Sequence, residues 1–203
     1  MKRRSSKKNL WADHYTRKAQ KDNYPARSVY KLQEIQKKTD VLRKGDRVLD
    51  LGCAPGSWTI YAAETVGPGG KVVGVDLNPV EVSLPANART ITGDLLEPDA
   101  DVREAMAGPC DVVLSDMAPA TTGNKNVDAV RSFVLAESAL ELAKTVLRPG
   151  GALVCKIFQG PDFEEFLNRI KAGFDRHKIY KPQSSRKSSR EIFIIGMGKK
   201  EEE

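Results

Sequence analysis

Residues 48–58 read VLDLGCAPGSW, and this stretch decides the fold. A short apolar run contains an acid and leads into a turn with two glycines, and residues 59–65 then have the composition of a helix. A strand, a tight turn and a helix in that order form the opening unit of a nucleotide-binding α/β sheet. Gly52 and Gly56 matter because only glycine turns this sharply and lets a ligand approach the backbone.

The spacing of these glycines narrows the choice of ligand. Gly52 and Gly56 are four positions apart, so the turn lacks the G-x-G-x-x-G pattern of dinucleotide sites. A cofactor without a pyrophosphate fits better, and S-adenosylmethionine is the leading candidate. A glycine-rich turn with no ligand is the alternative at this point, because a single turn of this kind is a weak signal.

Length and composition indicate one globular domain. The chain has 203 residues, of which 40% are hydrophobic and 30% charged. No apolar run approaches the roughly 20 residues that span a membrane, and residues 1–6 do not lead into a signal core. We therefore expect a cytoplasmic protein without a membrane partner. The cysteines have no metal-binding or disulfide spacing, so we expect buried thiols and no metal at Cys53, Cys110 and Cys155.

Charge is distributed unevenly along the chain. Residues 1–44 carry 14 lysines and arginines against 4 acids, and residues 171–200 carry 9 against 2. The segment between them is acidic. Two separate basic segments favour a nucleic-acid partner over a merely solvated tail. We expect a disordered basic tail over residues 1–9, one domain over 10–200 with basic helices in 10–44 and the sheet in 45–200, and an acidic tail over 201–203.

Acidic residues end three successive predicted strands. These strands cover residues 71–77, 88–93 and 111–117, and the acids are Asp76, Asp94 and Asp116. A sheet does not need acids there, and such sheets bind ligands at the carboxyl ends of their strands. Asp76 also lies near the offset at which an acid meets ribose hydroxyls. The loop that follows Asp116 is expected to contact a substrate.

Lys156 interrupts an apolar run in the fifth predicted strand, residues 152–158. A charge in a central strand is costly unless it is paired, which marks Lys156 as a functional candidate. Lys31 lies in a predicted helix over residues 28–38, and from periodicity alone it snorkels beside an apolar stripe. Further helices are predicted over 10–22, 127–147 and 161–173, and strands over 47–51, 178–181 and 191–197.

Five motifs in this order resemble the FtsJ-like family of 2′-O-ribose RNA methyltransferases. They are RSVYKL at 27–32, DLGCAPGSW at 50–58, SDMAP at 115–119, KIFQG at 156–160, and SSR at 184–186 with SRE at 189–191. The resemblance runs from Trp11 to Gly198, and within the family it is nearest to the heat-shock enzymes that act on large-subunit ribosomal RNA. It implies a seven-stranded, mostly parallel, doubly wound Rossmann-like sheet whose last strand is antiparallel.

The resemblance also implies the site. The family's catalytic tetrad falls on Lys31, Asp116, Lys156 and Glu191. Cofactor contacts fall on Gly52, Gly56, Trp58, Asp76, Asp94 and Asp116. Ser57 departs from the family's usual second glycine, which is harmless if its φ is ordinary and weakens cofactor binding if its φ is positive.

The implied reaction moves a methyl group from S-adenosylmethionine to a ribose 2′-hydroxyl. Lys156 acts either as a neutral base or as a charged group that orients the hydroxyl. The expected substrate is a uridine of large-subunit ribosomal RNA in the assembled subunit, and the expected enzyme is a monomer. The alternatives are methylation of a tRNA anticodon loop, a non-catalytic ribosome assembly factor, and a nicotinamide-dependent oxidoreductase, which the glycine spacing disfavours.

Overall fold

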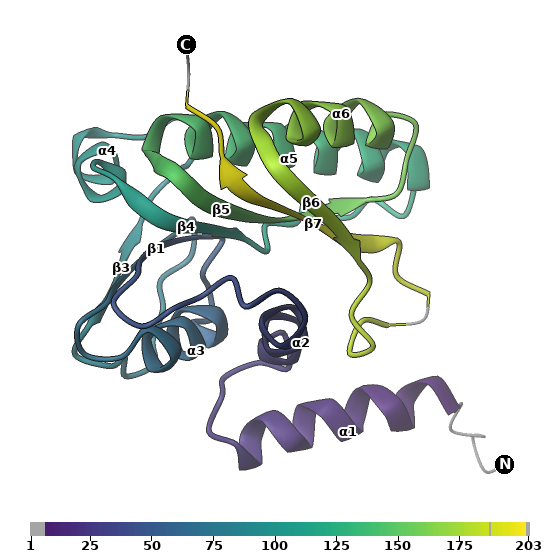
Figure 1. Cartoon of the computed structure of the whole chain (residues 1–203). Coiled ribbons are helices and arrows are strands. Elements are labelled where there is room, and N and C mark those ends of the chain that lie inside the picture. Colours follow the sequence, from purple (N-terminus) through teal and green to yellow (C-terminus); the bar gives the residue numbers. More distant parts are fainter. Residues whose placement is uncertain (1–6, 187, 202–203) are drawn as a thin grey trace, which may run out of the picture.

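The computed structural model describes residues 7–186 and 188–201, and within them seven strands form one sheet between two layers of helices (Figure 1). The strands are β1 (Arg47–Leu51), β2 (Lys71–Asp76), β3 (Ala88–Thr92), β4 (Cys110–Ser115), β5 (Leu147–Phe158), β6 (Phe174–Tyr180) and β7 (Glu191–Lys199). The helices are α1 (Lys7–Lys21), α2 (Val29–Thr39), α3 (Ser57–Val66), α4 (Ala100–Met106), α5 (Lys125–Val146) and α6 (Phe163–Gly173).

The strand order is β3-β2-β1-β4-β5-β7-β6. Neighbouring strands from β3 to β5 are parallel, whereas β7 runs antiparallel to both β5 and β6. The predicted sheet, with its antiparallel last strand, is therefore confirmed. Because the chain order reverses between β1 and β4, a crevice is expected outside the carboxyl ends of these strands.

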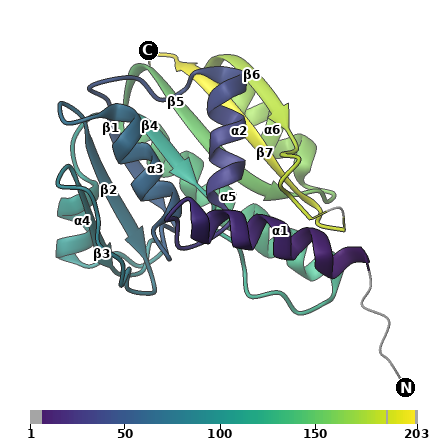
Figure 2. The ribbon, with the colours of Figure 1, turned by 90° about the horizontal axis from the view of Figure 1, so that it is seen from below.

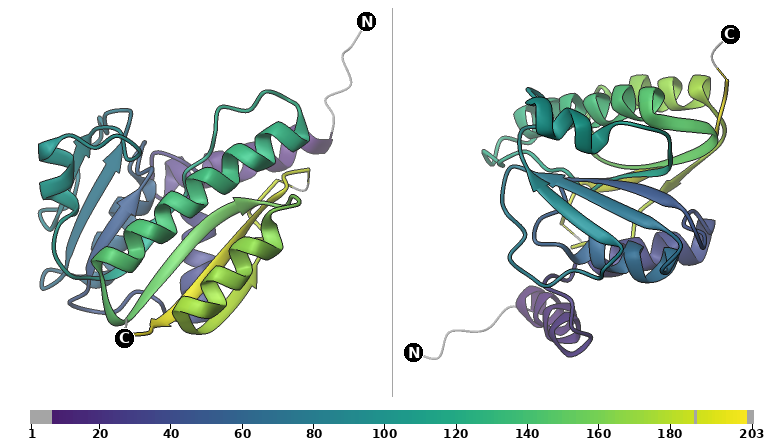
Figure 3. Two further views of the ribbon diagram at one scale, coloured as in Figure 1. Left: turned by 90° about the horizontal axis from the view of Figure 1, so that it is seen from above. Right: turned by 90° about the vertical axis from the view of Figure 1, so that its left-hand side faces the viewer.

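Alternate residues of the inner strands supply the two halves of the core. Leu49 and Leu51 pack with α4, α5 and α6 on one face, and Val48 packs with α2 and α3 on the other. Two views of the sheet from other sides show these layers (Figure 3). Burial on both faces explains why the inner strands read as nearly continuous apolar runs.

Helix α1 lies outside these layers and runs across α2 (Figure 2). It contacts the rest of the chain through an aromatic cluster in which Ala19 and Tyr15 meet Val29 and Tyr30. The helix begins at Lys7, three residues before the predicted start at residue 10, and the disordered tail over residues 1–9 stays a prediction. Lysine is a good helix former and extends the helix towards the N-terminus. The predictions for residues 1–6 and 202–203 lie outside the described residues.

Strand β5 begins at Leu147, five residues before the predicted start, and two further elements also differ from the sequence prediction. Helix α4 was not anticipated; its N-cap Asp99 accepts a hydrogen bond from the Val102 amide at 2.9 Å. Strand β6 is longer than the predicted residues 178–181, and its charged residues are largely exposed. Since β6 is an edge strand, its side chains face water and it lacks a buried apolar pattern. No helix of the described segments is long and apolar enough to cross a membrane.

Candidate active site and cofactor cavity

Lys156 lies near the carboxyl end of β5, two residues before the strand ends at Phe158. Only 5% of its side chain is exposed. Its Nζ donates a hydrogen bond to the Asp116 backbone carbonyl and a second one, of 2.9 Å, to Asp116 Oδ1. Lys156 therefore does not extend into solvent at the end of the strand.

Asp116 directly follows β4 and lies between two ammonium groups. Its Oδ1 is 2.9 Å from Lys156 Nζ and 3.5 Å from Lys31 Nζ. Burial raises the pKa of this carboxyl group, but the two lysines outweigh burial and hold the pKa below its ordinary value. Asp116 is thus a carboxylate throughout the physiological pH range.

Lys31 enters the same site from α2. Its Nζ donates a 3.0 Å hydrogen bond to Glu191 Oε2 and lies 5.7 Å from the ring centre of Phe193. Burial lowers the pKa of Lys31, but Asp116 and Glu191 outweigh burial and raise the pKa above its ordinary value. The snorkelling predicted from periodicity is wrong, because the side chain is paired with carboxylates beside the sheet.

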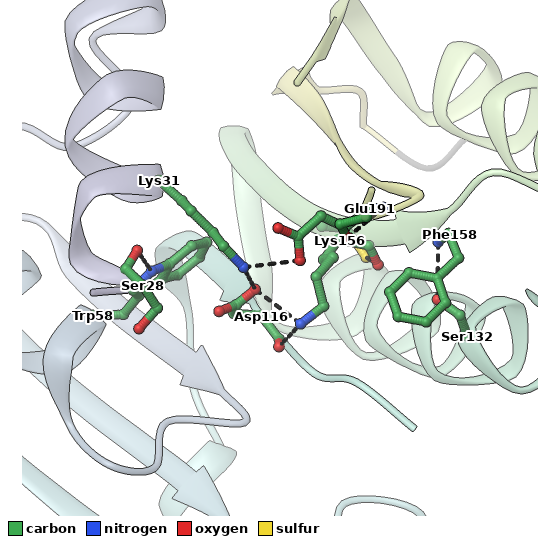
Figure 4. A network of polar contacts seen from close by, with 10 residues as sticks. Ser28, Lys31, Trp58, Asp116, Ser132, Lys156, Phe158 and Glu191 are labelled. Carbon is green, nitrogen blue, oxygen red and sulfur yellow. Dashed lines mark hydrogen bonds and ion pairs between the residues drawn. The ribbon is translucent and has the colours of Figure 1, made fainter. Parts of the chain in front are cut away.

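Glu191 opens β7 and completes an alternating row of charges (Figure 4). The row runs Glu191, Lys31, Asp116, Lys156, and each member comes from a different part of the chain. The antiparallel register places Glu191 opposite Phe158 of β5, two residues beyond Lys156. All four predicted tetrad residues therefore meet at one place.

A cavity of about 360 Å³ adjoins this row of charges at the carboxyl ends of the strands. Its walls include the three predicted acids Asp76, Asp94 and Asp116, together with Gly52 and the exposed Leu77. A larger hollow of about 700 Å³ lies at the opposite ends of β2 and β3, far from the tetrad. The position of the acids, and not the size of a hollow, therefore selects the candidate site.

The glycines of the first turn have specific steric roles. Gly52 has φ of 76°, and a Cβ there would lie 2.8 Å from Met117 Cγ. Gly56 has φ of 105°, and a Cβ there would lie 2.9 Å from Val80 Cγ1. Both positions thus require glycine, although Gly56 does not line the cavity.

Two of the acids at the strand ends also shape the cavity wall. Asp76 Oδ2 accepts a 3.0 Å hydrogen bond from the Ala54 amide, and Oδ1 accepts one of 2.8 Å from the Asn78 amide. Asp94 Oδ1 accepts a 2.8 Å hydrogen bond from the Leu96 amide. These contacts orient the carboxylates, and an ionised carboxylate oxygen can accept further hydrogen bonds from a ligand.

Trp58 does not line the cavity with its side chain. Its indole packs on Phe193 at 5.7 Å between ring centres, and its Nε1 donates a 2.8 Å hydrogen bond to the Ser28 carbonyl. Only 3% of Trp58 is exposed. A contact between Trp58 and a cofactor stays a prediction, and the observed role of the indole is to hold α3 against the start of α2.

Ser57 stands where the resembled family usually has a second glycine, and its backbone conformation is ordinary. It is the first residue of α3, and its φ is not among the positive values found in the described residues. Its Oγ accepts a 2.7 Å hydrogen bond from the Ala26 amide and donates one of 3.1 Å to the Ala26 carbonyl. The serine therefore adds a contact that glycine cannot make.

Asp50 is a buried acid near the site that sequence reasoning did not single out as functional. It is fully buried in β1; Oδ2 accepts a 2.7 Å hydrogen bond from Thr59, and Oδ1 has no partner. Burial raises the pKa of Asp50 to about 7. The available signal was an acid inside the apolar run of residues 48–51. The three cysteines are buried and free, as predicted, and within residues 7–186 and 188–201 no cluster of side chains could hold a metal ion.

Comparison with known proteins identifies the family of this chain. The sequence model of the FtsJ-like methyltransferase family matches residues 24–199. A protein of Desulforapulum autotrophicum named ribosomal RNA large subunit methyltransferase E is 60% identical over 198 residues, covering 98% of each chain. A protein of the same name from Desulfosudis oleivorans is 57% identical over 201 residues, covering 99% of this chain and 97% of the relative.

Solved structures agree on the fold. A ribosomal RNA methyltransferase candidate from Plasmodium falciparum superposes with a TM-score of 0.76 at 27% identity, covering 87% of this chain and 98% of that one. Aeropyrum pernix fibrillarin, solved with S-adenosylmethionine, superposes with a TM-score of 0.57 at 19% identity, covering 77% and 68%. The matched segment includes all four charged residues of the row, and the chain belongs to the FtsJ-like methyltransferase family.

Proposed function

We propose that this chain is an S-adenosylmethionine-dependent methyltransferase that modifies a ribose 2′-hydroxyl of large-subunit ribosomal RNA. The observation that carries the proposal is the convergence of Lys31, Asp116, Lys156 and Glu191 beside a cavity at the carboxyl ends of the strands. Relatives of 60% and 57% identity are named for ribosomal RNA methylation.

The side chains that line the cavity fit S-adenosylmethionine in their chemistry. Carboxylates suit ribose hydroxyls and a positively charged sulfonium, and Asp76 and Asp94 are the acceptors we assign to the adenosine part. Gly52 lets the first turn pack directly against Met117, which also lines the cavity, because a Cβ at this position would lie 2.8 Å from Met117 Cγ. When bound, the cofactor supplies a methyl group on a good leaving group, so the protein must chiefly prepare the attacking hydroxyl.

Lys156 is the group we assign to that hydroxyl. Two acceptors on Asp116 occupy two of the positions around Nζ. One position remains for the substrate: a lone pair that takes the proton if the amine is neutral, or a third N–H that stabilises developing negative charge if it is an ammonium. Both modes need the same geometry, and holding the reactants in line contributes to the rate in either case.

Lys31 and Glu191 support Asp116 in this assignment. Each carboxylate of the row is paired with at least one lysine, which makes their shared burial tolerable. The raised pKa of Lys31 keeps its charge in place, and this charge holds Asp116 ionised. Asp116, held in place by Lys31, then orients the Lys156 amine through two hydrogen bonds.

Ribosomal RNA as partner is supported by the basic segments around α2. Arg17 and Lys21 of α1 and Lys37 and Lys38 of α2 are exposed and can contact phosphates. At the finer level we propose a uridine in the assembled large subunit as the target, a monomeric enzyme without a bound metal, and a cytoplasmic location.

The test is transfer of labelled methyl groups to separated ribosomal subunits, ribosomes and tRNA. We expect label on a 2′-hydroxyl of large-subunit RNA with the wild type and no transfer with Lys156→Ala. Cofactor affinity should stay near the wild-type value, because the cavity walls do not include Lys156. Label on tRNA alone would overturn the substrate, and equal rates for both proteins would remove Lys156 from the reaction.

A further inference from the structure

The loop between β6 and β7, described over residues 181–186 and 188–190, leads directly into Glu191. Pro182, Ser184 and Ser185 are buried, although the loop is rich in polar residues. A turn closes it through a hydrogen bond of 3.1 Å from the Ser185 amide to the Pro182 carbonyl. Burial of this turn requires partners for its amide groups.

Glu34 supplies those partners from α2. Its Oε2 accepts hydrogen bonds from the Gln183 amide at 2.7 Å and from the Tyr180 hydroxyl at 3.0 Å. Its Oε1 accepts one of 2.9 Å from the Ser184 amide. Both oxygens of one carboxylate thus hold the loop by its backbone, and charge-assisted bonds of this kind are strong.

Glu34 lies three residues after Lys31, so both project from one side of α2. Lys31 contacts Glu191 at the end of the loop, and Glu34 contacts the turn inside it. The helix therefore holds the β6–β7 connection at two points, about one helical turn apart. Figure 1 shows the loop descending from the sheet on the α2 side.

The loop carries cations towards the same region. Arg27 precedes α2; burial lowers the pKa of its guanidinium and the nearby positive charge of Arg186 lowers it further, whereas the negative charge of Glu191 raises it. Arg186 is exposed on the loop, and an exposed arginine can bind an RNA phosphate. Fixing the loop therefore keeps Arg186 near Arg27 and Glu191 near Lys31.

We propose that Glu34 is a positioning residue that holds the loop 181–190 for contact with the RNA substrate, an inference that rests on the proposed function. Only a carboxylate has two oxygens that can both accept the hydrogen bonds made by this loop. An amide in its place would present an NH₂ group to the Ser184 amide or to the donors at Oε2, because glutamine has a single acceptor oxygen.

The test compares wild type, Glu34→Gln and the matched control Tyr180→Phe, which removes one donor and leaves both backbone contacts. For Glu34→Gln we expect the KM for the ribosomal substrate to rise about tenfold or more, with kcat changed by less than about threefold. Affinity for S-adenosylmethionine stays unchanged, and native trypsin cleavage after Arg186 becomes faster. The control matches the wild type in KM and cleavage.

Three results separate the possibilities. Wild-type KM and wild-type trypsin resistance in Glu34→Gln would overturn the inference. An equal loss of kcat, substrate affinity and cofactor affinity, with a lower melting temperature, would also overturn it in favour of a general structural role. An inactive wild type would instead count against the proposed function, while trypsin cleavage would still test whether Glu34 holds the loop.

Discussion

At the scale of single residues, the site depends on how burial and neighbouring charge act on carboxyl groups. Asp116 and Asp50 are close in the fold, and both are pulled towards neutrality by burial. Asp116 has two ammonium neighbours and remains ionised, whereas Asp50 has one hydroxyl donor and an unpartnered oxygen. The surroundings thus lower the pKa of Asp116 and raise the pKa of Asp50.

Asp50 gives the protein a pH-dependent stability. Its pKa in the folded state is about 7 against an ordinary 3.8, so the folded state holds a proton that the unfolded state has lost between these values. Stability therefore falls as pH rises across this window, by at most about 1.4 kcal/mol per pH unit. Urea unfolding of wild type and Asp50→Asn at pH 5 and pH 8 measures the effect.

The asparagine variant cannot ionise, so its stability relative to the wild type should be higher at pH 8 than at pH 5. Thr59 can still donate to the amide oxygen, which keeps the one hydrogen bond that Asp50 makes. A difference between the two proteins that is the same at both pH values would contradict a buried, proton-binding Asp50.

At the scale of elements, the contacts between the segment before α2 and the start of α3 position the helix that carries Lys31. The segment that leads from α1 to α2 is fixed on α3 by two residues of the motif, Ser57 through Ala26 and Trp58 through Ser28. Since α2 carries Lys31 and Glu34, the first turn of the sheet and the helix that completes the site are linked through these contacts.

Replacing Ser57 tests this joint. Ser57→Gly restores the usual family residue but removes two hydrogen bonds and leaves the Ala26 amide without its acceptor. We expect a loss of about 1–3 kcal/mol in the free energy of unfolding, measured in urea. Ser57→Ala is the control that keeps a Cβ and separates the lost hydroxyl from the added backbone freedom of glycine. An unchanged stability in both variants would show that the joint contributes nothing.

At the scale of the whole molecule, α1, α2 and the β6–β7 loop bring basic residues from both ends of the chain to one side of the sheet (Figure 1). Helix α1 packs on α2 through Tyr15 and Tyr30, and α2 in turn holds the basic β6–β7 loop through Glu34. The acidic middle of the chain forms most of the sheet and the cavity. Charge separated along the sequence thus becomes charge separated in space.

Salt dependence of RNA binding measures this arrangement. Each phosphate contact contributes about 0.7–0.9 to the slope of log affinity against log salt. Arg17→Glu with Lys21→Glu, both exposed on α1, should weaken binding and reduce the slope by about 1 per lost contact. Lys144→Glu with Lys171→Glu makes the same charge change on α5 and α6, across the sheet (Figure 1), and should leave the slope unchanged. Equal slopes for all three proteins would exclude α1 from the RNA surface.

The sequence alone determined where most strands lie, which of them are apolar, and which acids follow them. These follow from local rules: apolar runs of strand length, glycines at a tight turn, and polar residues where a strand leaves the core. It missed α4, whose seven residues have little periodicity, and the full length of β6, whose edge position leaves charges on its surface. Periodicity also misjudged Lys31, whose partners come from β7 and from the residue after β4.

Only the tertiary structure decided which residues meet. Asp116 lies 40 positions from Lys156, and Lys31 lies 160 positions from Glu191, so no local pattern specifies their contacts. The parallel crossovers and the antiparallel last strand bring these residues together at the carboxyl ends of β4 and β5. The roles of Ser57 and Glu34 also depend on this packing, because each holds a backbone segment that is distant in sequence and adjacent only in the folded chain.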